Sequence, residues 1–187
     1  MEHQGRRTHG EDERMSKEEQ RATRERINVL RQADIFYDLT EAQLEMVASI
    51  ASEAEYGMGE VIFRENSAGD ELYVIASGEV EIQVDPGLIK PGGKGENRPV
   101  TIATLRSGQT FGEVTLVDQG LRTASARSAS RQTRLLIIPR DRLITLCDHY
   151  PELGYRLMRN IAADLAFKIR GTDLLIREQL LWRPRYR

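Results

Sequence analysis

The sequence predicts an α+β fold in which an antiparallel β jelly-roll barrel is flanked by N-terminal helices and by C-terminal helices, the last of them long. Between about residues 55 and 139, short apolar stretches recur every eight to twelve residues or so and are separated by turn residues, as in antiparallel barrels. Apolar residues on either side follow helical spacing instead. The 187 residues suffice for one domain and are too few for two of full size.

The first 26 residues form a charged leader for which we expect disorder or, from Ser16, an exposed helix. They contain three apolar residues against seven acidic and seven basic ones, so they cannot bury a face. Helical spacing of charges favours the exposed helix, through Glu18, Arg21, Arg24 and Glu25. The domain itself is expected to span residues 27–182, and residues 183–187 to form a basic tail.

The N-terminal part of the domain shows two helical patterns. The first is an apolar set that comprises Ile27, Leu30, Ala33, Ile35 and Phe36. In the second, Thr40 followed by an acidic residue and Gln43 is typical of a helix N-cap. We expect this helix to run from Thr40 to about Ser52 and to bury Leu44, Val47, Ala48 and either Ile50 or Ala51.

Period-two patterns predict the strands of the barrel. They are expected at 61–63, 72–75, 79–84, 100–105, 124–129 and 133–138. Residues 85–99, rich in glycine, proline and charge, should form a long hairpin loop. C-terminal helices follow at 140–182: a short one over 140–149, and a long one that opens at Pro151. Its apolar stripe comprises Leu153, Leu157, Ile161, Leu165 and Ile169 and continues through Leu175, Ile176 and Leu180.

Composition argues against several classes of function. The three histidines, at positions 3, 9 and 149, lie outside the barrel, so we expect no metal site and no catalytic histidine. Charge is balanced at 27 basic and 29 acidic residues, which gives no sign of direct DNA binding. The apolar stretches fall short of the ~18 residues of a membrane span. A single cysteine, Cys147, cannot form an internal disulfide and fits a reducing compartment. From these observations together we expect a cytoplasmic protein that is neither an enzyme nor bound to a membrane.

The segment from 111 to 126 carries the strongest functional signal. Gly112 allows the backbone to approach a ligand closely, and Glu113 begins a short helical turn. Nine residues later, Arg122 lies between apolar and small neighbours, which indicates a partly buried guanidinium that needs an anion. A 3′,5′-cyclic nucleotide matches both side chains, because arginine pairs with its phosphate and the glutamate accepts a hydrogen bond from the ribose 2′-hydroxyl.

These residues resemble the cyclic-nucleotide-binding domain family, which is found in catabolite-activator-type regulators, cyclic-nucleotide-dependent kinases and gated channels. Three features of this sequence are similar to the family's phosphate-binding cassette: the segment FGEVTL, the segment RTA, and the interval of nine residues from Glu113 to Arg122. The family's first barrel strands and glycine turns are similar to GEVIFRENSAGDELYVIASGEVEI. The resemblance extends over about residues 30–182.

The resemblance implies a set of ligand-binding residues: Phe111, Gly112, Glu113, Val114, Thr115, Arg122, Thr123 and Ala124. By this resemblance, Gly112 and Glu113 would contact ribose. Arg122 and the amides near Val114 and Thr115 would hold phosphate. Thr123 sits beside phosphate and base, and threonine there is compatible with cGMP as well as with cAMP. The sequence departs from the family pattern at three positions: Thr115 replaces alanine, Leu121 replaces proline and Asn66 replaces glycine.

Two functions remain open at this point. The first is a cAMP or cGMP receptor. For it, the resemblance implies that phosphate draws in the cassette, that the hinge after Pro139 releases, and that the last helix closes over the base through Leu165, Ile169 or Thr172. Such a receptor would signal through a protein partner. The second is a ligand-free interaction and dimerisation module, in which Glu113 and Arg122 form only a salt bridge. In both, the C-terminal helix is expected to form a homodimer.

Overall fold

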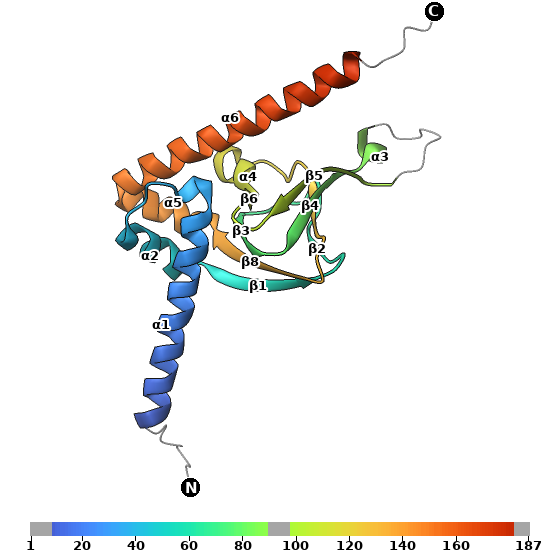
Figure 1. Ribbon diagram of the computed structural model, residues 1–187. Coiled ribbons are helices and arrows are strands. Elements are labelled where there is room, and N and C mark those ends of the chain that lie inside the picture. Colours follow the sequence, from blue (N-terminus) through green and yellow to red (C-terminus); the bar gives the residue numbers. More distant parts are fainter. Residues whose placement is uncertain (1–8, 90–97, 182–187) are drawn as a thin grey trace, which may run out of the picture.

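The computed structural model describes residues 9–89 and 98–181, with helices gathered at one end of a β-barrel (Figure 1). The N-terminal elements are α1 (His9–Gln32), a 3-10 turn η1 (Asp34–Phe36) and α2 (Glu41–Ile50). The C-terminal elements are α5 (Arg140–His149) and α6 (Pro151–Leu181). Helices from both ends of the sequence pack together, since α2 contacts α5 and α6 contacts η1.

The barrel consists of two four-stranded antiparallel sheets in the described part of the chain. One has the order β1-β8-β3-β6 and the other β2-β7-β4-β5. The strands are β1 (Ser52–Gly57), β2 (Val61–Phe63), β3 (Glu71–Ser77), β4 (Glu79–Val84), β5 (Val100–Arg106), β6 (Thr110–Phe111), β7 (Ser125–Ser128) and β8 (Gln132–Pro139). The predicted fold class, a jelly-roll barrel between two helical groups, is confirmed.

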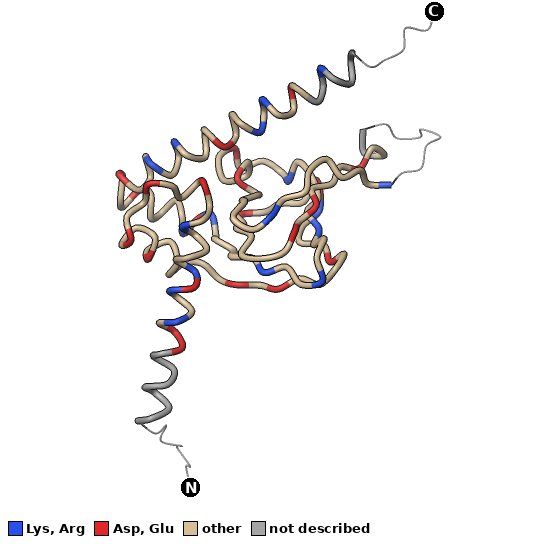
Figure 2. The backbone as a smooth tube through the Cα atoms, in the orientation of Figure 1, with Lys and Arg blue, Asp and Glu red and all other residues tan. Residues whose placement is uncertain are grey.

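Helix α1 covers the charged leader from His9 onward. Helix α1 begins at His9, whereas residues 1–8 lie outside the described residues. Its C-terminal end is anchored because Ile27 and Leu30 are buried in the core. Further out, an i,i+4 ion pair of 3.1 Å joins Arg21 to Glu25. Figure 2 shows acidic and basic positions mixed along the coloured part of this helix.

Helix α2 begins as expected and ends earlier than expected. Thr40 and Gln43 form a complete capping box, in which each side chain bonds to the other's backbone amide. The helix ends at Ile50, since Ala51 is already extended and Ser52 begins β1 opposite Ile137 of β8. Strand β1 and the two-residue β6 were not predicted, and a short helix α3 (Pro86–Ile89) lies in the predicted 85–99 loop. Residues 90–97 of that loop are outside the described part.

Two apolar cores hold the molecule together. One lies between the helices and one face of the β1-β8-β3-β6 sheet, and the other fills the barrel. Helix α6 contributes Leu153, Leu157 and Ile161 to the first core. Beyond them it runs past the barrel and away from the body (Figure 1). The side chains of Leu175, Ile176 and Leu180 and residues 182–187 lie outside the described part of the chain. None of the helices described is long and apolar enough to cross a membrane.

Candidate ligand-binding site

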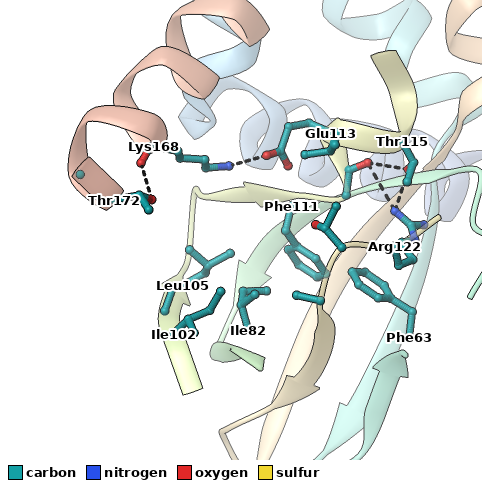
Figure 3. A pocket seen from close by; sticks show the side chains of 16 residues that line it. Phe63, Ile82, Ile102, Leu105, Phe111, Glu113, Thr115, Arg122, Lys168 and Thr172 are labelled. Atoms are coloured by element: carbon teal, nitrogen blue, oxygen red, sulfur yellow. Dashed lines mark hydrogen bonds and ion pairs between the residues drawn. The ribbon is translucent and has the colours of Figure 1, made fainter. Parts of the chain in front are cut away.

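A cavity of about 540 Å³ lies between the barrel and α6 (Figure 3). One wall is apolar and is formed by barrel residues Phe63, Ile82, Ile102, Ala103, Leu105 and Phe111. The opposite wall comes from α6, through Lys168, Gly171 and Thr172. The edge between them is the short helix α4 (Glu113–Asp118) and the loop that connects it to β7. All eight residues predicted to bind a ligand line this one cavity.

Gly112 shapes the polar edge of the cavity. Its backbone is left-handed, with φ of 83°, and it is the N-cap of α4. A Cβ at this position would lie 2.7 Å from Nη1 of Arg122 and 2.8 Å from the carbonyl oxygen of Glu71. Only glycine therefore allows the chain to turn here and the guanidinium to pack against the turn.

Arg122 is more deeply buried than the sequence predicts, with 2% of its surface exposed. Its Nη1 donates to the Gly112 carbonyl (3.3 Å) and to the Thr115 hydroxyl (3.0 Å). Its Nη2 donates to the backbone carbonyl and to the carboxylate of Glu71, each at 3.0 Å. Nε is buried without a hydrogen-bond partner among the described residues. The arginine is thus held at the cavity edge by a carboxylate that is itself 42% exposed.

Two aromatic rings cover the guanidinium. Its central carbon lies 4.3 Å from the ring centre of Phe63 and 5.5 Å from that of Tyr73, which are cation–π distances. The Tyr73 hydroxyl also donates to the Glu71 carboxylate at 3.4 Å. Burial, together with that neighbouring carboxylate, raises the pKa of Tyr73 to about 12. Tyr73 therefore remains a neutral donor to Glu71 at physiological pH.

Thr115, a departure from the family pattern, adds a contact to the site. It is 3% exposed, and its hydroxyl donates to the Gly112 carbonyl at 3.0 Å while accepting from Arg122. An alanine at this position would offer neither bond.

Asn66, another departure from the family pattern, has φ of 61°, the left-handed conformation that asparagine tolerates better than most residues.

Glu113 pairs with a residue of α6 rather than with Arg122. The Lys168 ammonium donates to Oε1 of Glu113 at 2.9 Å (Figure 3). It also donates to the Thr110 carbonyl at 3.2 Å. It also forms an ion pair of 2.8 Å with Asp164, one turn earlier on α6. Burial alone would lower the pKa of Lys168, but the two carboxylates outweigh it and the pKa is raised. The lysine is therefore fully charged near neutral pH.

Sequence reasoning missed the partners of both predicted charges. Glu71 and Lys168 lie 51 and 55 residues from the groups they hold, and no local spacing connects them. The salt bridge between Glu113 and Arg122, considered for a ligand-free module, is not the pairing observed. Of the residues expected to cover the base, Thr172 lines the cavity, Leu165 packs against the helical core and Ile169 is 62% exposed.

Comparison with known proteins agrees with this geometry. The family model for the cyclic nucleotide-binding domain matches residues 53–150. A cyclic AMP receptor protein of Thermus thermophilus is 33% identical over 140 residues, which are 75% of this chain and 59% of the relative. A cGMP-dependent protein kinase of Caenorhabditis elegans is 30% identical over 62% of this chain and 14% of the kinase.

The solved structures agree with these sequence matches. A putative cyclic nucleotide-binding protein from Geobacter metallireducens superimposes with a TM-score of 0.61 at 30% identity, over 75% of this chain and 95% of that one. The chain spans less than two thirds of the length of the curated relatives described above, 59% and 14% respectively. Because the family model alone covers more than half of the sequence, the chain belongs to the cyclic nucleotide-binding domain family.

Proposed function

We propose that this protein is a receptor for a 3′,5′-cyclic mononucleotide, cAMP or cGMP, that changes conformation on binding and signals through a protein partner. One observation carries the proposal. A cavity of about 540 Å³ places a buried arginine and a buried glutamate at one edge of an apolar chamber. That volume lies within the range of about 300–1,000 Å³ typical of small-molecule sites.

The chemistry of the cavity suits each part of such a ligand. The cyclic phosphate carries one negative charge, which the Arg122 guanidinium would pair with, helped by the amides near Val114 and Thr115. The Glu113 carboxylate would accept a hydrogen bond from the ribose 2′-hydroxyl. The base would lie against the apolar wall of the barrel, where Thr172 of α6 lines the other side. The two relatives described above are named for cAMP and for cGMP, and Thr123 is compatible with both.

A thermal-shift series tests the proposal. We expect cAMP or cGMP at 100 times its dissociation constant to add about 2.7 kcal/mol of stability. For a chain of this size, that free energy raises Tm by about 5–10 °C. Arg122→Ala should abolish the shift, and Arg122→Lys, which retains the charge but not the fork of donors, should reduce it.

The controls separate loss of the site from loss of the fold. Arg131→Ala removes an exposed arginine just after β7 and should leave the shift unchanged. Circular dichroism verifies that each variant is folded before its shift is interpreted. If neither nucleotide raises Tm of the wild type, the receptor proposal is wrong and the ligand-free interaction module stands. If a folded Arg122→Ala variant keeps the full shift, the ligand binds elsewhere.

We also propose that the receptor is a homodimer formed through α6. Along its length, this helix carries large apolar side chains that are mostly exposed in the described part of the chain: Tyr155, Phe167, Ile169 and Leu174 are 62–76% exposed. Side chains of this kind on a long helix are typical of helix pairing between two copies. Pairing through the same helix that lines the cavity would link ligand binding to the dimer interface.

A further inference from the structure

We infer that Lys168 is a positioning residue for nucleotide binding: its ion pair orients the Glu113 carboxylate toward the ribose and fastens α6 over the cavity. The inference rests on the proposed function, because it assigns a role at the same site. Beyond that function, it couples binding of the ligand's ribose to the Lys168 side chain of α6.

The contacts of Lys168 connect three elements at one point. Its ammonium group bonds to Glu113 at the start of α4 and to the Thr110 carbonyl in β6, and it pairs with Asp164 on its own helix. The ammonium group thus makes two hydrogen bonds to the barrel side of the cavity and one ion pair within its own helix. Since the partners come from α4, β6 and α6, movement of α6 away from the barrel would separate Lys168 from two of them.

Glu113 depends on this lysine for its charge partner. Only 6% of the Glu113 side chain is exposed, and a buried carboxylate without a cation is costly. The other cation that lines the cavity, Arg122, is paired with Glu71. Lys168 therefore supplies the positive charge that keeps a buried acceptor available in a largely apolar chamber.

The geometry leaves one carboxylate oxygen for the ligand. Lys168 bonds to Oε1 of Glu113, and no donor to Oε2 is observed among the described residues. A ribose 2′-hydroxyl would donate to Oε2 while the lysine holds Oε1, so the two interactions support each other. Without the lysine, the carboxylate is free to rotate and the hydroxyl loses its fixed acceptor.

The position of Lys168 along α6 makes it the last polar anchor described between that helix and the barrel. The buried residues of the helix end at Ile161, and the neighbours of Lys168 on either side, Phe167 and Ile169, are 76% and 62% exposed. The end of α6 that carries Gly171 and Thr172 to the cavity is thus held by this ion pair. We expect α6 to be less protected from hydrogen exchange when the pair is removed.

A thermodynamic cycle tests the inference on the full chain, freed of bound nucleotide by unfolding and refolding. Titration calorimetry compares cAMP with 2′-deoxy-cAMP, and cGMP with 2′-deoxy-cGMP, on the wild type and on Lys168→Met. We expect loss of the 2′-hydroxyl to weaken binding at least about tenfold in the wild type and less than about threefold in the variant. A lysine that only stabilised the fold would weaken both members of each pair by the same factor.

Two further variants serve as controls. Lys168→Arg retains the positive charge and should restore most of the dependence on the 2′-hydroxyl. Arg170→Met removes an exposed positive charge two residues further along α6 and should leave it unchanged. Equal 2′-hydroxyl effects in wild type and Lys168→Met would overturn the inference while leaving the receptor proposal intact. Absence of binding to all four nucleotides by the wild type would overturn both.

Discussion

At the scale of single residues, the polar edge of the cavity is a hydrogen-bond network around one guanidinium. Arg122 is held by Glu71, Gly112 and Thr115, and two aromatic rings lie over it. Thr115 is the member of this network that the family pattern does not predict. Its hydroxyl is both a donor and an acceptor, so it joins the arginine to the glycine turn.

Removing this hydroxyl should weaken both stability and binding. Thr115→Val keeps the volume of the side chain but leaves one buried N–H of Arg122 without its partner. We expect a loss of about 1–2 kcal/mol in the free energy of unfolding, measured by urea denaturation. Thr104→Val, at an exposed position of β5, should change stability by less than about 0.5 kcal/mol. Equal effects of the two substitutions would show that the hydroxyl contributes nothing to the network.

At the scale of elements, the strand that sequence analysis missed joins the first helix to the barrel. Glu53 of β1 accepts hydrogen bonds of 3.0 Å from Arg26 of α1 and from Arg134 of β8. Burial alone would raise the pKa of Glu53, but the two arginines outweigh it and the pKa lies below its usual value of 4.5. The carboxylate therefore stabilises the fold in its ionised form.

The pH dependence of this contribution has a defined sign. Because the folded pKa is lower than the unfolded one, the stabilisation is fully present above pH 4.5 and is lost as the pH falls through the folded pKa. We expect Glu53→Gln to lower stability by about 1 kcal/mol at pH 7, since the three side chains are partly exposed. The difference from wild type should shrink between pH 4.5 and pH 3 in thermal melts. Glu45→Gln, exposed on α2, should show no such trend.

Elements with a strong local signal were predicted well from the sequence. The capping box predicted the start of α2, and Pro151 predicted the start of α6. The strict alternation of apolar and polar residues predicted strand β4. Strand β1 has a weak signal, because Ser52, Glu53 and Glu55 are exposed and only Ala54 and Tyr56 are partly buried. Strand β6 is two residues long, too short for any period.

The candidate site was predicted only as far as it is local. Gly112, Glu113 and Arg122 lie close together in the segment 111–124, so their spacing alone marks them as candidate ligand-binding residues. The ion pairs that hold the two charges depend instead on tertiary packing. Lys168 meets Glu113 because α6 crosses the barrel beside β6, and no residue near it in the sequence indicates that crossing.

At the scale of the whole molecule, the large exposed apolar side chains of α6 are the basis of the proposed dimer. Substituting a charge there should break the proposed dimer. We expect the wild type to elute with twice the 21.3 kDa mass of one chain in size-exclusion chromatography with light scattering, and Phe167→Glu to elute as a monomer. Met58→Glu, at an exposed position before β2 and far along the chain from α6, should remain a dimer. A monomeric wild type would rule out pairing through this helix.

The network around Arg122 also bears on how fast and how tightly an anion can be taken up. A free arginine side chain loses about 1.5–2 kcal/mol of rotamer entropy when it is fixed. In this protein, four hydrogen bonds and two rings fix it before any ligand arrives. The ordering cost therefore falls on folding and not on association, and a phosphate meets a preorganised cation.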